Sequence, residues 1–591
     1  MAERTDENMI IDQGRDKQAL GQFFTPIEVV SFIYDVLKVM LSRDEKWTQG
    51  KYPSIIDPAC GEGVFLKIAL DKEITRPKYV FGIDIDERAK QKWKKINLLK
   101  SFGSKAKLDV HFFHQNGLFP LPQKRLRYKR GGLDEYDLTV GNPPYGGVGL
   151  QEITPELQAA LLKYDIWRRA LKENRNSDGF LPFDKLPENL SKKQEERLKT
   201  LPIEILFLER FVQLTKSGGY IGIIIPDGVL ANVELQYVRN WLFEKTKVKA
   251  IISLPRETFK SVGTTAKTSI LFLQKLGEGE KPLPKQEIFM ASAEDVGVNY
   301  SGKNDLPAIL QEFQKFIHRK EIQEVHMSPH FTTIVKGTKD TLHRIDADYW
   351  NPKYTKMIRI MRNNFKVQSL GDFITFITYG AIVVGKKRKF VSSGVSYINQ
   401  INVRNTGLDI FLEPRYIGKN DLRNQRRCKP LKYDILFNRD QIGTIGRCLV
   451  FNKETKNYAV NDHVDIIRVR EINSHYVVSF LLTKYGQSQV ERLSSGVSGV
   501  IGITFKEIKS IQIPVLPDAY QKKIENEYKK MSKQHHLAME AKARATKRGK
   551  SSKEAEQDPE YLKNIQKAEK MLDDLTKQTE EVIEGKRSDI S

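Results

Sequence analysis

The sequence predicts an α/β protein with a doubly wound, mostly parallel sheet, followed by an α+β module and a helical tail. Short apolar runs separated by amphipathic stretches extend from Gly21 to about residue 275, a pattern typical of a parallel sheet covered on both faces. Between residues 347 and 517, short β-like runs alternate with turns. Beyond Pro517 the periodicity becomes helical.

The length of 591 residues indicates several domains. The turn signals and shifts in composition suggest where they begin and end. We expect a short N-terminal extension, an α/β domain interrupted by a polar insert, a charged connector, the α+β module and the helical region, at residues 1–20, 21–275 (insert 147–202), 276–346, 347–517 and 518–591.

The composition favours an intracellular protein that binds an acidic partner. The formal net charge is +23, which makes nucleic acid the first candidate. The three cysteines have no paired spacing, so neither a disulfide framework nor a metal site is expected. The polar N-terminus and the lack of a long apolar run predict neither a signal peptide nor a membrane span. We therefore expect a cytoplasmic protein.

The segment DPACGEG, residues 57–63, runs from an expected strand through a turn into a helix. Gly61 and Gly63 remove side chains where a ligand could lie against the backbone. A turn of this kind is weak evidence alone, but Asp84 ends the next strand about twenty residues later, where a carboxylate can bind ribose hydroxyls. The open sheet and this turn make the domain Rossmann-like.

The turn lacks the second glycine interval of a dinucleotide site and the Lys-Ser/Thr of a phosphate loop. A nucleoside with an amino-acid tail, S-adenosylmethionine, fits better. Asp57 can face the ammonium of the tail. Asn116 can accept a hydrogen bond from an adenine amine, although an Asn before Gly is also a common turn residue.

The segment DLTVGNPPY, residues 137–145, runs from a strand directly into an amide, two prolines and an aromatic ring. Each proline holds the residue before it extended, so the Asn142 side-chain oxygen and the Pro143 carbonyl point in fixed directions. Two such acceptors can hold the hydrogens of a base amine and leave its lone pair facing a methyl donor. Tyr145 can stack on the base. A rigid proline turn is the alternative.

These motifs, in this order, resemble those of the DNA amino-methyltransferases, most closely the modification subunits of type I restriction-modification systems. GQFFTPIEVV (residues 21–30) resembles the opening motif of that family, and GGYIGIIIP (218–226), IISLPRETF (251–259) and KTSILF (267–272) resemble its later strands. The resemblance implies Phe259 as a second aromatic face. Asn116 departs from the family, in which many members carry Asp.

The resemblance implies two sets of site residues. The catalytic set is Asn142, Pro143, Pro144 and Tyr145. The residues expected to bind S-adenosylmethionine are Phe24, Thr25, Pro26, Asp57, Pro58, Ala59, Gly61, Gly63, Asp84, Ile85, Asn116, Gly117 and Asn142.

The α+β module resembles one target-recognition half of a type I specificity subunit. DILFNRDQIGTIG (434–446) and SGVSGVIGIT (495–504) carry this looser resemblance. It implies a module that reads a DNA sequence. The candidates for DNA contact are Lys386, Lys387, Arg388, Lys389, Arg423, Arg426, Arg427 and Arg439; such basic runs are also common on solvated surfaces.

The favoured hypothesis is a site-specific methyltransferase acting on the N6 amine of an adenine flipped out of double-stranded DNA, within a restriction-modification or related defence or epigenetic system. The alternatives are a cytosine-N4 methyltransferase, a bifunctional restriction-modification enzyme, an RNA or protein amide methyltransferase, and a DNA-binding protein without activity. The tail carries an apolar heptad at Tyr561, Ile565, Ala568, Leu572, Leu575, Thr579 and Val582. A heptad seam can pack within the chain or bind a second copy or a partner subunit.

Overall fold

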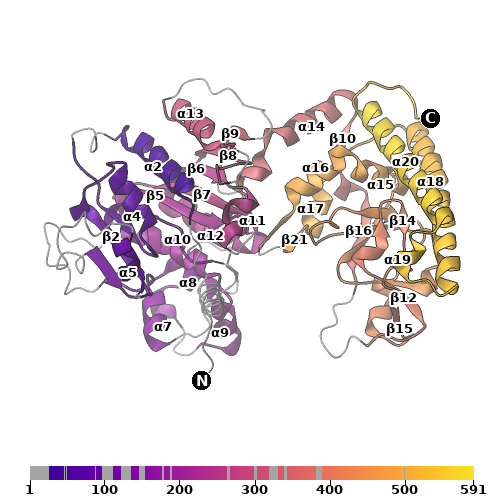
Figure 1. Cartoon of the computed structure of the whole chain (residues 1–591), viewed down its shortest axis with the longest axis horizontal. Helices are drawn as coiled ribbons and strands as arrows, with labels where there is room; N and C mark the ends of the chain where they lie inside the picture. The colour runs from indigo at the N-terminus through magenta and orange to yellow at the C-terminus, as the bar shows by residue number, and fades with distance from the viewer. Residues whose placement is uncertain are drawn as a thin grey trace. The chain divides into compact units, whose positions relative to one another are not determined.

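The computed structural model (Figure 1) forms two compact units, the first made of residues 1–352 and 496–498 and the second of residues 353–495 and 499–591. Each unit is described by itself. The structure describes residues 25–44, 47, 50–86, 88–95, 111–121, 135–145, 154–172, 174–175, 179–186, 190–262, 266–298, 302–318, 330–338, 342–380, 389–497 and 500–590.

The first unit is built on a nine-stranded sheet in the order β3-β2-β1-β4-β5-β7-β6-β8-β9. β1 pairs in parallel with both β2 and β4, so the strand order reverses between β1 and β4. β7 runs antiparallel between β5 and β6. The strands are β1 (Ile55–Asp57), β2 (Val80–Asp84), β3 (Phe112–His114), β4 (Tyr136–Gly141), β5 (Thr215–Pro226), β6 (Thr246–Ser253), β7 (Thr268–Lys275), β8 (Gln286–Ser292) and β9 (Phe331–Gly337).

Helices cover both faces of this sheet, because side chains alternate along each central strand and both sets are apolar. On β5, Tyr220 and Ile224 join one core cluster, while Ile221 and Ile223 join the other. The helices that contribute to the first cluster are α2 (Ile27–Leu41), α4 (Val64–Asp71), α5 (Arg88–Lys95) and α13 (Leu306–Ile317). Those of the second are α7 (Pro155–Leu161), α8 (Asp165–Ala170), α9 (Lys192–Lys199), α10 (Ile203–Leu214), α11 (Asp227–Ala231) and α12 (Gln236–Lys245).

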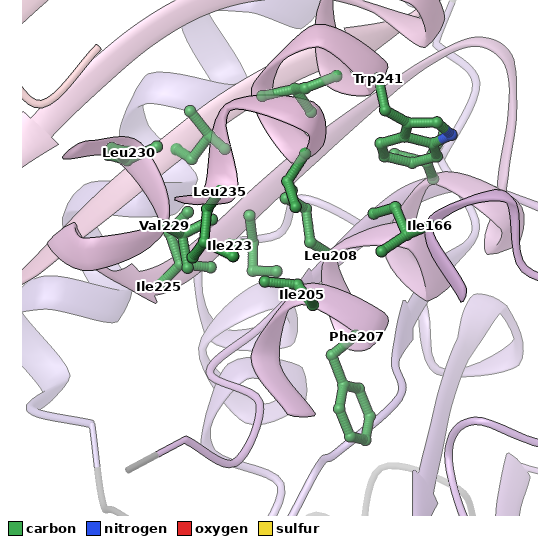
Figure 2. Packing of buried hydrophobic residues seen from close by; sticks show 14 of the residues in the cluster. Ile166, Ile205, Phe207, Leu208, Ile223, Ile225, Val229, Leu230, Leu235 and Trp241 are labelled. Carbon is green, nitrogen blue, oxygen red and sulfur yellow. The ribbon is translucent and has the colours of Figure 1, made fainter. Parts of the chain in front are cut away.

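Figure 2 shows part of the second cluster, where Ile205 and Leu208 of α10 lie beside Ile223 of β5. Ile166 of α8 belongs to the same cluster. The described part of the polar insert buries apolar side chains in this cluster. The expected connector, residues 276–346, supplies β8 and β9 to the sheet edge. Its strands were hard to recognise because consecutive β8 residues are buried on both faces.

The second unit combines small sheets with helices, as the α+β prediction requires. Its four-stranded sheet has the order β11-β19-β16-β17, and a three-stranded sheet has the order β15-β12-β18. These strands are β11 (Ile374–Tyr379), β12 (Val395–Ile398), β15 (Tyr416–Ile417), β16 (Ile435–Asn438), β17 (Cys448–Val450), β18 (Tyr458–Val460) and β19 (Val464–Val469). The two-stranded pairings are β10 (Val367–Ser369) with β22 (Gln512–Pro514) and β13 (Val403–Arg404) with β14 (Gly407–Leu408). Two further short strands are β20 (Ser495–Val497), most of which belongs to the first unit, and β21 (Val500–Gly502).

Two long helices, α18 (Asp518–Lys547) and α20 (Pro559–Ile583), pack along each other as the helical hairpin that the sequence predicts (Figure 1). The remaining helices are α14 (Pro352–Asn364), α15 (Ser474–Leu482), α16 (Lys484–Leu493), α17 (Phe505–Ser510) and α19 (Ser552–Ala555). None of the helices in the described ranges is long and apolar enough to cross a membrane.

Candidate active site

Three polar side chains lie where parallel strands end at the same edge of the sheet. Asp57 ends β1, Asp84 ends β2, and Asn142 directly follows β4. The strand order reverses between β1 and β4, which is the position where open α/β sheets usually bind their ligands. The residues that the sequence singled out are therefore gathered at one edge.

The turn after β1 is held by the acid at the end of β2. The Gly61 amide donates to Asp84 Oδ2 at 2.7 Å, and the Asp86 amide donates to Asp84 Oδ1 at 2.8 Å. Gly61 and Gly63 have φ values of +47° and +82°, in the left-handed region that favours glycine. Asp84 thus orders this turn.

Asp57 is a buried acid whose charged form receives little stabilisation from its surroundings. Its side chain is 1% exposed, and its Oδ1 accepts a hydrogen bond from the Ala59 amide at 3.0 Å. Burial raises the pKa of Asp57 to about 8, the Ala59 amide opposes this rise, and the nearby Asp84 charge adds to it. A cationic ligand group beside Asp57 would favour the ionised form, which suits an ammonium.

Close approach of the backbone fixes two further glycines at this edge. A Cβ atom at Gly117 would lie 2.1 Å from the Pro58 carbonyl oxygen, and one at Gly141 would lie 2.5 Å from Asp57 Oδ1. Ile85, next to Asp84, is 56% exposed and offers an apolar face for a planar ring. The segments around the ends of β1, β3 and β4 therefore meet too closely for larger residues at these two positions.

The amide of Asn142 has one end engaged and one end without a partner. Its Nδ2 donates to Thr25 Oγ1 at 3.1 Å, which orients the side chain from the far side of the site. Its Oδ1 is buried and meets no hydrogen-bond donor among the described residues. A buried acceptor without a donor is costly, so this oxygen is suited to bind a group that carries N–H.

Tyr145 and Phe259 contact each other, and their rings do not lie parallel on either side of a space for a base. Their ring centroids are 6.5 Å apart at an interplanar angle of 81°, and both rings are buried. Burial raises the pKa of Tyr145, and an interaction with the Asn142 side chain partly counters that rise. Edge-to-face contact is a favoured geometry for aromatic pairs. The expected arrangement, a base between two parallel rings, would require one of them to turn.

Asn116 is committed to a turn. Its Oδ1 accepts a hydrogen bond from the Leu118 amide at 3.0 Å, as in the turn role that was the alternative to binding adenine.

Phe24, also expected at the cofactor, lies outside the described residues. Sequence reasoning missed Phe207, whose ring would lie 3.0 Å from a Cβ atom at Gly117. Helical periodicity alone marks Phe207 only as a core residue.

The basic candidates in the second unit have different environments. Lys386, Lys387 and Arg388 lie outside the described residues, while Lys389, Arg426 and Arg427 are exposed. Arg423 does not fit the expectation of a phosphate contact. Its side chain is 1% exposed, pairs with Asp421 at 2.7 Å and donates to the Lys389 carbonyl. The guanidinium is thus used inside the fold.

Arg439, the remaining candidate, is partly exposed. Its guanidinium lies 4.5 Å from the centroid of the Tyr379 ring and 3.7 Å from the Asp440 carboxylate. Neither contact uses all five of its N–H donors. Unlike Arg423, it therefore keeps donors at the surface.

The heptad of the C-terminal helix packs within the chain. Its central residues are buried where α20 lies along α18, namely Ala568, Leu572, Leu575, Thr579 and Val582. Lys542 of α18 is fully buried and pairs with Asp409 at 2.8 Å and Glu556 at 2.7 Å. The seam is therefore occupied by the protein's own helix.

In the described part of the chain, no group of three or more His, Cys, Asp or Glu is placed to hold a metal ion.

The sheet order, the antiparallel β7 and the acids at the ends of β1 and β2 define the first unit as a methyltransferase-type α/β domain. The chain matches three family models: N-6 DNA Methylase over residues 181–348, Eco57I restriction-modification methylase over 78–259, and Type I restriction modification DNA specificity domain over 362–533. It therefore joins an N-6 DNA methylase domain to a type I specificity domain. The methylase family implies S-adenosylmethionine as the cofactor.

Among curated proteins, the chain is similar to the Escherichia coli Type II restriction enzyme and methyltransferase RM.Eco57I, with 25% identity over 42% of this chain and 23% of that protein. It is 26% identical to YtxK of Bacillus subtilis over 39% of this chain and 53% of that protein. It is 23% identical to the Escherichia coli EcoEI type I methylase subunit over 44% of each. The chain thus spans about half or less of each curated relative. The type IIG restriction endonuclease BpuSI is 14% identical with a TM-score of 0.43, covering 94% of this chain and 66% of that one, a similarity too low to support an inference.

Proposed function

We propose that this protein is a site-specific DNA methyltransferase that transfers a methyl group from S-adenosylmethionine to the N6 amine of an adenine, within a restriction-modification or related system. The observation that supports this most directly is the buried Asn142 oxygen without a donor, which follows β4 in an Asn-Pro-Pro-Tyr segment. An exocyclic amine brings the N–H groups that this oxygen lacks.

The cofactor fits the edge formed by β1 and β2. S-adenosylmethionine supplies a methyl group on a positively charged sulfur. Asp57 would pair with its ammonium, and Asp84 would accept from the ribose hydroxyls while still holding the Gly61 amide. Ile85 and Phe207 would contact the adenine ring. The tight approaches at Gly117 and Gly141 leave the backbone itself as the wall of the site.

The amine of the base would be held by two acceptors. Asn142 Oδ1 and the Pro143 carbonyl would each accept one of its hydrogens, which favours a tetrahedral nitrogen with its lone pair facing the methyl group. Such positioning needs no strong base. The ring of Tyr145 would contact one face of the base, which must leave the duplex to reach a buried site.

The second unit would select the sequence. Exposed Lys389, Arg426, Arg427 and Arg439 would contact phosphates and set the register, since basic side chains on DNA mainly position the protein. The charge of +23 supports a polyanionic partner. Because the heptad seam is filled by α18, self-association or binding of a partner subunit would use other faces of the helices.

Modification-sensitive long-read sequencing tests this function. DNA from methylation-deficient cells that express the intact protein should carry N6-methyladenine at one sequence motif, and cells expressing Asn142→Ala should lack it. N4-methylcytosine at the motif would instead favour the cytosine alternative, because the same acceptors suit that amine. Unmodified DNA from cells in which the folded protein binds S-adenosylmethionine would contradict a DNA substrate for this chain acting alone.

A further inference from the structure

Glu204 is a buried acid in the first turn of α10. Its side chain is 3% exposed, and its Oε2 has no hydrogen-bond partner among the described residues. Glu209, on the same helix and also buried, accepts from the backbone amides of Asp165 and Ile166 at 2.6 and 2.7 Å. One acid is thus explained by the fold of α8, and the other is not.

The surroundings of Glu204 contain little charge of either sign. Burial raises its pKa to about 7, opposed by a backbone amide of its own helix, and no charged side chain contributes. Helix α10 packs against α8, β4 and β5. Of the charged residues on these elements, Asp165 pairs with Arg168, Arg169 with Glu244 and Lys216 with Asp137. The Arg210 guanidinium of α10 donates to the carbonyl oxygens of Gly117 and Phe119.

Glu204 lies on the face of α10 that meets the segments around the ends of β3 and β4. Phe207 and Phe211 follow Glu204 by three and seven residues, so the three side chains share one face of the helix. The Phe211 ring would lie 3.2 Å from a Cβ atom at Gly141, the residue before Asn142, and the Phe207 ring would lie 3.0 Å from one at Gly117.

Because α10 leads directly into β5, which is parallel to β4, the first turn of α10 lies at the edge where β4 ends. The Glu204 charge also raises the pKa of the Tyr145 hydroxyl, in agreement with a position beside the Asn-Pro-Pro-Tyr segment. A buried carboxylate left without a cation is unfavourable by itself. A positive charge that develops near it during a reaction would stabilise it.

Methyl transfer supplies such a charge. The C–S bond breaks with its electron pair kept by sulfur, and the nitrogen lone pair forms the new C–N bond. The positive charge thereby moves from the sulfonium to the base amine, and it leaves when that nitrogen loses a proton. Fixed groups that oppose a moving charge in a dry site are effective in catalysis, because they need no reorganisation.

We propose that Glu204 is a positioning residue that provides the negative charge opposite this moving positive charge. The proposal rests on the methyltransferase function above and extends it to a residue outside the recognised motifs. Only the ionised carboxylate can act in this way. The bound cation favours that form, so activity should be gained as pH rises towards neutrality.

The test is the single-turnover rate of methylation at saturating S-adenosylmethionine between pH 5 and 8.5, on unmethylated bacterial genomic DNA with tritium in the transferred methyl group. Saturation removes the titration of Asp57, which acts on cofactor binding. The intact protein should show a rate that rises with pH to a plateau, with its inflection at or below about 7. Glu204→Gln should lower the plateau about 10- to 100-fold and abolish the inflection, and Glu204→Asp should retain it.

Glu209→Gln is the matched control, since it alters a buried acid of the same helix whose role is structural. It should lower the melting temperature and leave the pH profile unchanged. Melting temperature and S-adenosylmethionine affinity check that each variant is folded, and Glu204→Asp provides the pH profile if the amide variant is unstable. An unchanged rate in Glu204→Gln, or equal losses in both Glu204 variants with the inflection intact, would overturn the proposal. An inactive wild type that binds the cofactor would instead overturn the DNA methyltransferase function on which it rests.

Discussion

The replacement Asp57→Asn should stabilise the protein and abolish cofactor binding. The Asp57 pKa rises from its ordinary value of 3.8 to about 8 because the carboxyl is buried. The folded protein therefore holds more protons than the unfolded chain between these two pH values, and stability falls as the pH rises through that range. Asparagine keeps an acceptor for the Ala59 amide and has no charge to bury.

The size of the effect follows from the pKa values. Each pH unit in this range costs about 1.4 kcal/mol, so the carboxyl lowers stability by up to about 4 kcal/mol at pH 7 and by about 1.6 kcal/mol at pH 5. The variant should be more stable than the wild type at both pH values, with a gap that widens by about 2 to 3 kcal/mol from pH 5 to pH 7.

Denaturant unfolding at the two pH values measures this gap, and titration calorimetry measures cofactor binding. The wild type should release about one proton on binding S-adenosylmethionine at pH 7, visible as a dependence of the heat on the buffer, because the bound ammonium ionises Asp57. The variant should show at least a 100-fold loss of affinity. A gap that stays constant between pH 5 and pH 7, or cofactor binding unaffected by the substitution, would refute this account of Asp57.

Three further substitutions separate the roles assigned to other positions. Gly117→Ala, whose Cβ would lie 2.1 Å from a carbonyl oxygen, should cost about 1–3 kcal/mol and weaken S-adenosylmethionine binding in calorimetry, while Gly418→Ala, with open space around it, should do neither. Arg423→Ala should lower the melting temperature because its buried ion pair is lost. Arg426→Ala should leave the melting temperature unchanged and reduce the salt dependence of DNA binding by about one charge. A lower melting temperature for Arg426→Ala and an unchanged one for Arg423→Ala would contradict the buried position assigned to Arg423 and the exposed position assigned to Arg426. Lys542→Ala should destabilise the protein by about 3–5 kcal/mol, since it leaves two carboxylates without their buried cation, and a melting temperature equal to that of the wild type would exclude this.

The sequence by itself determined which residues meet at the sheet edge. Asp57, Asp84 and Asn142 each follow a short apolar run, and the carboxyl ends of parallel strands lie side by side whatever the details of packing. The C-terminal helices were also predictable, because a heptad seam is a local property of the sequence, whereas the partner of the seam was not. Patterns of this kind are fixed by neighbours along the chain.

The tertiary structure alone decided how individual polar groups are satisfied. Arg423 belongs to a basic run whose sequence suggests an exposed surface, yet it pairs with the nearby Asp421, donates to the Lys389 carbonyl from a distant segment and is buried. Asn116 turns its oxygen to its own backbone, while Asn142, the same residue type, donates to Thr25 through its nitrogen and has an oxygen that meets no donor among the described residues. The sequence of α10 gives no reason to treat its two acids, Glu204 and Glu209, differently. Only in the folded protein do backbone amides of α8 donate to Glu209 and not to Glu204. A hydrogen bond depends on atoms brought together from distant parts of the chain, which no local pattern contains.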